Sequence, residues 1–304
     1  MHRPLSPSGV VRRTDNRLGI GYMVLAMLLM ASVDAQTKYL SQTLPVLQVA
    51  WFRQLGLLVG MLAIVGASGL QVLRTARPGL QLLRGALAVG SAVCFILAIS
   101  RVPLVDAAAV TFVAPLVVTV MGAVLLGEPV GIRRWAAAIV GFTGAMIVLR
   151  PGLGVVHPAA LFALGSAFMF ASRQVLSRVL ADSDSTRTTL AYTALVGSAL
   201  LTIPLPFIWQ APQTVVEFVL LAGIGVLAGL GELCVIKALE VGEAVAVAPM
   251  QYTTLLWTTV YGWLLFADLP DLWTLVGSLI VVASGLYTFH RERRRMANAG
   301  AGRG

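Results

Sequence analysis

Ten long apolar runs joined by short connectors occupy most of this 304-residue chain, and they set the strongest limit on its fold. Each run is about 17–25 residues long, which is the length an α-helix needs to cross a bilayer. The runs are continuously apolar rather than alternating, and this favours helices over the strands of a β-barrel. The sequence therefore predicts an all-α integral membrane protein with ten transmembrane helices, at 18–39, 46–67, 82–101, 104–126, 132–149, 158–179, 188–209, 214–238, 244–266 and 270–289.

The overall composition supports a membrane protein and argues against a nucleic-acid partner. Hydrophobic residues make up 58% of the chain and charged residues 12%, and the mean hydropathy is +0.87, which is more apolar than one soluble core can bury. The net charge of +9 raises the question of nucleic acid. However, the arginines form short clusters between apolar runs, without the interleaved aromatics of a nucleic-acid reader. We expect no nucleic acid among the partners.

Cysteine and histidine offer no metal site and no disulfide framework. Cys94 and Cys234 each lie inside an apolar run, and His2, His157 and His290 lie at segment ends or in a tail. The chain also lacks a G-x-x-x-x-G-K-[ST] phosphate loop, so ATP hydrolysis is not expected. We expect no cofactor and no bound metal.

Lysine and arginine collect on one side of the predicted topology. With both termini in the cytoplasm, seventeen of the 22 fall at cytoplasmic ends: Arg3, Arg12, Arg13, Arg17, Arg74, Arg77, Arg84, Arg133, Arg134, Arg178, Arg187, Lys237, Arg291, Arg293, Arg294, Arg295 and Arg303. This bias predicts cytoplasmic termini, in the inner membrane of a bacterium. The first run also resembles a signal peptide with small residues at 33–35, but we keep it as a helix because the repeat described next requires it.

The chain repeats itself at an offset of 140 residues. The aligned pairs are Ser32/Ser172, Lys38/Arg178, Cys94/Cys234, Ala98/Ala238, Gly122/Gly262 and Glu128/Asp268, and one extra residue then aligns Gly144 with Gly285. Each unit holds five helices, so the second enters the membrane upside down. Inverted repeats of this kind support alternating access to a site near the midplane. We expect a basic tail at 1–17, repeats at 18–150 and 151–290, and a basic tail at 291–304.

Two stretches carry a resemblance to a known family. "VTFVAPLVVTVMGAVLLGEPVGIRRWAAAIVGFTGAMIVLRPG" (Val110 to Gly152) resembles the end of the first EamA repeat of the drug/metabolite transporter superfamily, and "YGWLLFADLPDLWTLVGSLIVVASGLYTFHRE" (Tyr261 to Glu292) resembles the end of the second. The resemblance implies that family's ten-helix fold and a transport function. Members include exporters of amino acids and carriers of riboflavin or S-adenosylmethionine. The matching acid and glycines mark the fold there and transfer no substrate site.

Polar side chains in the fourth and ninth runs are candidates for lining a substrate cavity, because polar groups are costly in lipid. Their spacing predicts one polar face on each helix, and the candidates are Thr111, Pro115, Thr119, Gln251, Tyr252, Thr258 and Tyr261. Pro115, and Pro249 nearer the cytoplasm, would each free a backbone carbonyl. The alternative is that threonine and glycine serve helix packing.

Charged residues within the runs are candidates for proton coupling or charge pairing: Asp34, Arg53 and Glu232. The spacing allows Asp34 to pair with Lys38, and Arg173 to pair with Glu232. Glu128 and Asp268 each precede a proline by one or two residues. We expect them to lie at helix N-termini on opposite faces of the membrane, where their carboxylates accept hydrogen bonds from free backbone N–H groups.

These observations predict a secondary-active or facilitative transporter that moves a small neutral or zwitterionic organic metabolite, of amino acid, riboflavin or S-adenosylmethionine type. Its expected partners are that solute, the bilayer and, if transport is coupled, protons. One alternative is an exporter of cationic drugs or quaternary amines, which would need a membrane carboxylate. An intramembrane enzyme would need a nucleophile with a base or a metal cluster at one depth, which we do not find. A regulatory membrane protein would carry a soluble module. Neither the direction of transport nor the oligomeric state can be read from the sequence.

Overall fold

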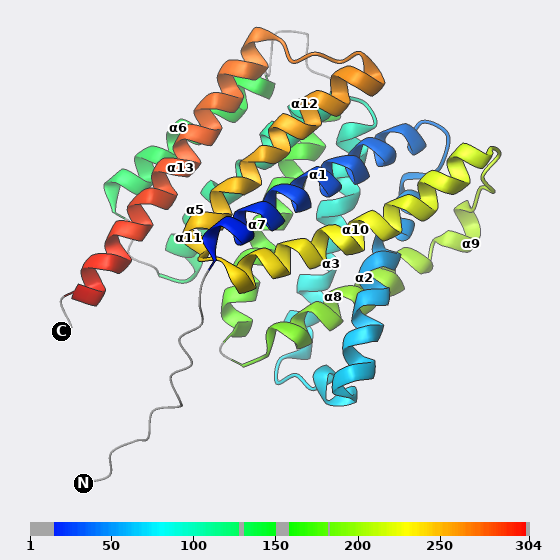
Figure 1. The fold of residues 1–304 in the computed structure, drawn as a ribbon, viewed down its shortest axis with the longest axis horizontal. Helices are drawn as coiled ribbons and strands as arrows, with labels where there is room; N and C mark the ends of the chain where they lie inside the picture. Colours follow the sequence, from blue (N-terminus) through cyan, green and yellow to red (C-terminus); the bar gives the residue numbers. More distant parts are fainter. Residues whose placement is uncertain (1–14, 128–130, 150–157, 182, 302–304) are drawn as a thin grey trace.

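The computed structural model describes residues 15–127, 131–149, 158–181 and 183–301, and these form helices and turns without a strand (Figure 1). The elements are α1 (Asn16–Leu40), α2 (Val46–Ser68), the 3₁₀ turn η1 (Leu70–Leu73), α3 (Pro78–Ile99), α4 (Leu104–Thr111), α5 (Ala114–Leu125), α6 (Ile132–Leu149), α7 (Ala160–Ala181), α8 (Thr186–Thr202), α9 (Leu205–Ile208), α10 (Val215–Val241), α11 (Ala244–Val247), the 3₁₀ segment η2 (Ala248–Tyr252), α12 (Thr253–Phe266) and α13 (Leu272–Ala301).

The ten predicted runs each become helix, which confirms the all-α membrane fold, but three runs are not continuous, and the seventh is divided into α8 and the short α9. The fourth is divided into α4 and α5, and the ninth into α11, η2 and α12. In the described chain, six helical spans are long and apolar enough to cross a bilayer, and shorter apolar helices lie at Trp135–Val148 and Leu272–Tyr287. The helix of the last run continues to Ala301, into residues predicted as a tail.

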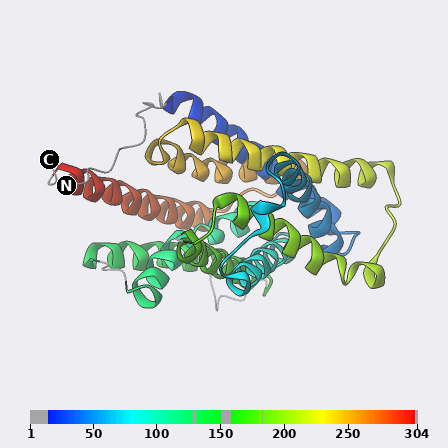
Figure 2. The same cartoon turned by 90° about the horizontal axis from the view of Figure 1, so that it is seen from below.

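Two layers of helices face each other (Figure 2). One contains α1, α10 and α12, and the other contains α7, α3 and α5. The largest helix contacts within the layers occur in duplicate when the repeats are exchanged: α1 packs on α10 as α7 packs on α3, α1 on α12 as α7 on α5, and α2 on α10 as α8 on α3. A contact pattern that is unchanged by this exchange is the signature of a pseudo-two-fold axis between the layers.

In two further contacts a helix packs on its own equivalent from the other repeat, and the relative direction of the two helices gives the direction of the axis. In the pair α2 and α8, Trp51 donates to Thr202 Oγ1 over 2.9 Å, whereas Met61 packs with Ala191. The pair α6 and α13 is also antiparallel, because Ala137 is bonded by Ser284 and Val148 lies at Gly277. Antiparallel equivalents require an axis perpendicular to the helices, so the repeats are inverted.

Capping residues fix where the long helices begin. Thr214 and Glu217 form a reciprocal capping box at the start of α10, and Thr43 donates to the Glu217 carboxylate over 2.8 Å. Asp15 caps α1 and its N–H donates to the Val241 carbonyl at the end of α10. These bonds satisfy orphan N–H groups and tie α1 to α10 at both ends. We call the end where α1 begins the termini end, and the opposite end, where α1 stops, the far end.

Candidate functional site

The broken helices of the fourth and ninth runs meet at the pseudo-two-fold axis. Phe112 follows α4 and Tyr252 ends η2, and their rings stack with centroids 4.8 Å apart and planes 29° apart. The two residues are 140 apart in sequence, so each is the repeat equivalent of the other. A residue that touches its own equivalent has to lie close to the axis. A Cβ at Gly285 would overlap the Tyr252 hydroxyl, so a glycine is needed there.

The break between α4 and α5 follows from Pro115, and it corrects one expectation. Pro115 has no N–H and cannot donate to the Thr111 carbonyl, so the helix ends at Thr111 and restarts at Ala114. Thr111 therefore does not share one continuous helical face with Pro115 and Thr119, as the spacing predicted. In the ninth run, Pro249 lies in the 3₁₀ segment that separates the single turn of α11 from α12, so this break falls nearer the start of the run.

The polar candidates make mostly local bonds. The hydroxyls of Thr111, Thr119 and Thr258 each donate to a carbonyl three or four residues earlier on the chain, and Thr258 is fully buried. Tyr261 shares a 2.6 Å hydrogen bond with Ser32 of α1, and Gln251 is exposed. Phe112, the partner of Tyr252, was missed from the sequence, although the 140-residue offset of Tyr252 points directly to it.

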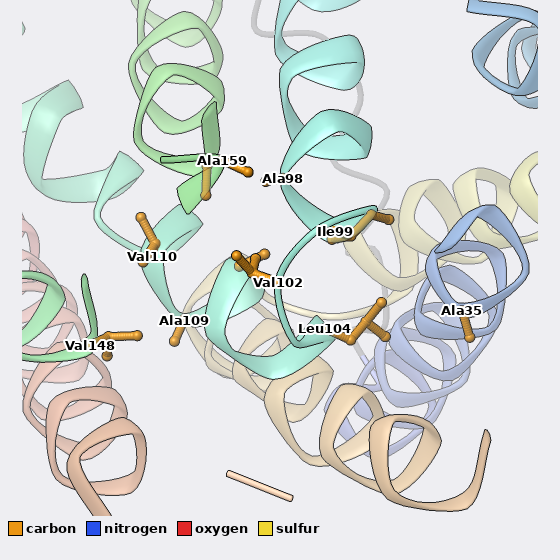
Figure 3. Close-up of a cluster of buried hydrophobic side chains, with 11 residues drawn as sticks. Ala35, Ala98, Ile99, Val102, Leu104, Ala109, Val110, Val148 and Ala159 are labelled. Carbon is orange, nitrogen blue, oxygen red and sulfur yellow. The ribbon is translucent and has the colours of Figure 1, made fainter. Parts of the chain in front are cut away.

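At the far end an apolar cluster joins the two layers (Figure 3). It contains Ala35 of α1, residues of α3, α4 and α7, and Val148 of α6, and Tyr261 and Phe266 of α12 pack against it. Toward the termini end, two apolar clusters stay within one layer, one around Met23 and Ala238 and the other around Val118 and Ala171, whereas a third, of Met61, Ala191 and Ala194, joins α2 to α8 beside the layers. Among the described residues, the apolar cluster that joins α1 and α12 to α3 and α7 therefore lies at the far end.

Lys38 closes the far end with polar bonds. Its Nζ donates over 2.9 Å to the Val102 carbonyl in the α3–α4 connection and over 2.9 Å to Asp268 after α12. The predicted pairing of Lys38 with Asp34 is therefore wrong, because Asp34 turns to Arg53. The expectation that Asp268 lies at a helix N-terminus is also wrong: Asp271 accepts the Thr274 N–H at the start of α13, and Asp268 is left to bind Lys38. Glu128 falls outside the described residues.

Arg53 and Asp34 form a second ion pair between α2 and α1. Arg53 donates to Asp34 Oδ1 over 2.7 Å, and the side chains are 26% and 10% exposed. The sequence required a partner for Arg53, and the structure supplies one from a neighbouring helix. Because both charges are largely withdrawn from solvent, removing one would leave the other uncompensated.

A cavity of about 870 Å³ lies between α2, α10 and the start of α8. Its wall is mainly apolar, and Glu232 and Arg187 are its charged lining residues in the described chain. Gly56 of α2 packs directly on the backbone of Gly225 and Gly229, and Glu232 follows them along the same side of α10. The size suits a small organic ligand. Of the residues predicted from sequence Glu232 lines this cavity, and the seven polar candidates do not.

Two arginines lie across the gap from Glu232. Arg173 of α7 and Arg84 of α3 are within electrostatic range of it, although no ion pair within 4.0 Å joins Glu232 to either of them in the described structure, so their predicted pairing is not formed. Arg84 was interpreted only as a topology signal. Pro78 at the first turn of α3 was the missed clue, because it starts the helix earlier and places Arg84 almost two turns inside.

Outside the membrane spans, Asp184 ties the α7–α8 connection to the start of α3. It accepts hydrogen bonds from the hydroxyl of Thr75, the amide of Gln81 and the N–H of Ala76. Partial burial opposes ionisation, but these hydrogen bonds and the charge of Arg77 outweigh it and hold the pKa of Asp184 below its ordinary value. This is a structural anchor at the termini end.

Comparison with known proteins decides the family. The model of the EamA-like transporter family matches residues 17–150 and again residues 157–289, which together span most of the chain and both halves of the repeat. The chain belongs to the EamA-like transporter family. It is a multi-pass membrane protein, as its apolar helices require.

Its EamA relatives carry different solutes. A riboflavin transporter of Vibrio cholerae is 32% identical over 91% of this chain and 94% of its own length. An S-adenosylmethionine uptake transporter of Rickettsia bellii is 28% identical, with coverage of 92% and 96%. A pseudopaline exporter of Pseudomonas aeruginosa is 28% identical, with coverage of 88% and 94%. One protein of known crystal structure aligns with a TM-score of 0.62 over 91% of this chain and 98% of that one, at 20% identity, which supports the fold alone.

Proposed function

We propose that this EamA protein carries a small neutral or zwitterionic organic metabolite across the bacterial inner membrane by alternating access, without enzymatic activity. The observation that carries the proposal is the asymmetry between the ends of two symmetric layers. An apolar cluster and Lys38 seal the far end, whereas the charged lining of the cavity, Glu232 and Arg187, lies toward the termini end. Inverted repeats that are closed at one end and open at the other are the arrangement that alternating access needs.

In this proposal both termini are cytoplasmic, the far end is external, and the repeats span 18–150 and 151–290 between the tails 1–17 and 291–304. The stacked pair Phe112 and Tyr252 supports a substrate position near the axis, with Thr111 and Gln251 as its neighbours in the chain. An aromatic pair at the midplane suits the planar or amphipathic solutes that the relatives carry.

Proton coupling, if present, belongs to Glu232 rather than Asp34. Asp34 is held by Arg53, whereas Glu232 faces the cavity without an ion pair among the described residues. The same contact removes Asp34 as the carboxylate that export of cationic drugs would need and leaves Glu232 for that role, so the cationic dyes in the screen below test this alternative. Coupling through Glu232 predicts that Glu232→Gln removes the dependence of flux on a pH gradient while leaving exchange at equal pH.

A thermal-shift screen of the purified protein tests the proposal, with amino acids, riboflavin, S-adenosylmethionine and cationic dyes as ligands. We expect stabilisation by a metabolite rather than by the dyes. Flux of that metabolite into proteoliposomes should fall in Tyr252→Ala and Thr111→Val. If these variants and Gln251→Ala all carry it at the wild-type rate, the axial site is wrong.

A further inference from the structure

Three charged side chains on three helices lie within electrostatic range of one another, in the halves of these helices nearer the termini end. Arg84 lies on α3, Arg173 on α7 and Glu232 on α10, and the α3–α7 pair belongs to one layer while α10 belongs to the other. Two cations and one anion leave one positive charge uncompensated within the group. Charges at this depth are costly unless a partner neutralises them, so the excess charge has to be explained.

Arg84 is held by neutral oxygens and is fixed in place. Its guanidinium donates to the Ser177 hydroxyl over 2.7 Å, to the Thr193 hydroxyl and to the Thr189 carbonyl over 3.4 Å. Ser177 in turn donates to the Arg173 carbonyl over 2.7 Å, which joins the two arginines through one hydroxyl. These acceptors orient Arg84 but do not cancel its charge.

Arg173 is less satisfied than Arg84. Its guanidinium carbon lies 4.7 Å from the centre of the Phe170 ring, while its Nε is buried and makes no hydrogen bond. A buried donor without an acceptor is expensive and uncommon in a folded protein. Glu232, the neighbouring carboxylate, lies beyond ion-pair distance of Arg173 in the described structure and lines the cavity. The group therefore has an unused donor on Arg173 and an excess positive charge, and its anion, Glu232, lies in the cavity wall.

We propose that Arg173 binds a carboxylate of the transported solute, and that the substrates of this carrier are carboxylate-bearing metabolites. One carboxylate supplies the acceptor that Nε lacks and brings the charge of the group to zero. A planar guanidinium also offers two parallel N–H donors, which match a carboxylate in a way that an ammonium does not. Arg84 adds a fixed second positive charge, and the Glu232 carboxylate in the cavity wall lies within electrostatic range of both arginines. This inference rests on the proposed transport function.

The test compares two probes that differ by one carboxylate, S-adenosylmethionine and decarboxylated S-adenosylmethionine, with riboflavin as a probe that has none and the twenty common amino acids as further carboxylates. Binding to the purified full-length carrier is measured by titration calorimetry, and flux is measured in proteoliposomes. We expect carboxylate-bearing probes to bind, and removal of the carboxylate to weaken binding by about tenfold or more, as loss of a charge-assisted pair does.

Variants assign that effect to Arg173. Arg173→Gln should bind both members of the probe pair equally weakly, and Arg173→Lys should recover only part of the difference. Arg101→Gln, an exposed arginine at the far end, is the matched control and should behave as wild type. If Arg173→Gln does not fold, as judged by gel filtration in detergent, the comparison of the probe pair on the wild-type protein decides the matter alone.

Different outcomes would overturn the carboxylate site and the proposed transport function. Saturable flux of riboflavin or decarboxylated S-adenosylmethionine at least equal to that of every carboxylate probe overturns the carboxylate site and leaves a transporter. Unchanged discrimination in a folded Arg173→Gln also overturns it. Absence of binding and flux for all probes overturns the proposed transport function itself.

Discussion

Lys38 is predicted to hold the far end closed, so that Lys38→Met should open it. The ammonium joins α1 to the α3–α4 connection through the Val102 carbonyl and to the α12–α13 connection through Asp268, and it lies 5.0 Å from the centre of the Phe266 ring. Methionine keeps the length of the apolar stem but removes every donor. All three contacts therefore disappear while the packing of the stem on its neighbours is preserved.

The magnitude follows from the exposure of the two partners. Hydrogen bonds to charged groups contribute about 1.5–3 kcal/mol. The Lys38 side chain is 10% exposed, but that of Asp268 is 31% exposed and partly screened, so the low end, about 1.5 kcal/mol for the whole latch, is appropriate. That free energy corresponds to about a tenfold larger population of the far-open state.

A buried reporter cysteine measures this population. Ala107 is 1% exposed within the far-end cluster, so Ala107→Cys should react with a maleimide only when that end opens. In a background lacking Cys94 and Cys234, we expect Lys38→Met to raise the labelling rate about tenfold. The matched control is Lys237→Met, which removes a lysine from an exposed pair with Glu240. An unchanged rate in Lys38→Met, or an equal rise in both variants, would refute the latch.

Three further predictions concern stability. Asp34→Asn leaves the Arg53 guanidinium without its ion-pair partner and should lower the free energy of unfolding by about 3–5 kcal/mol, measured as a lower thermal midpoint in detergent. The double variant Asp34→Asn/Arg53→Gln should recover part of that loss. Equal midpoints for wild type and the single variant would contradict this. Gly56→Ala places a Cβ onto the Gly225 carbonyl and should lower the free energy of unfolding by about 1–3 kcal/mol. Gly60→Ala on the same helix is the control, because a Cβ there meets nothing within 4 Å and stability should not change. Similar losses of stability in both variants would argue against the close crossing of α2 and α10. The pKa of Asp184 is depressed in the folded protein, so the stability that its carboxylate contributes is present above the unfolded pKa of 3.8 and is lost as pH falls through the lower folded pKa. Asp184→Asn should therefore lower the thermal midpoint at pH 7 and have the same midpoint as wild type in strong acid. A difference between the two midpoints that stays constant with pH would exclude the carboxylate as the cause.

Much of the fold could be predicted because lipid imposes simple rules on sequence. Continuous apolar runs have to be helices, and a shared offset of 140 residues predicts paired halves, so the family and the inverted repeat were accessible without coordinates. The helix breaks were only partly accessible. Pro115 predicts a helix break from the sequence alone. The change of helical face between Thr111 and Thr119 depends on the turn at Phe112 and Val113, which the sequence does not predict.

The side-chain partners were much harder to predict, because local spacing competes with tertiary contacts. Asp34 and Lys38 lie four residues apart on one helix, yet each finds a partner on a different segment, and no rule of helical spacing selects Arg53 or Asp268. Arg84 was hidden for another reason: an arginine near a helix end is read as a topology signal unless the helix start is known. Phe112 was recoverable from the repeat alone, since it is the equivalent of Tyr252.

Counterflow in proteoliposomes tests most directly the claim that this chain moves solute by alternating access between its two layers. Vesicles loaded with excess unlabelled solute from the thermal-shift screen are diluted into a trace of the labelled form. We predict transient accumulation of label that saturates with concentration, is abolished in protein-free vesicles and falls in Tyr252→Ala. Entry of label that is linear in concentration and indifferent to the internal load would contradict a carrier with one site and two alternating openings.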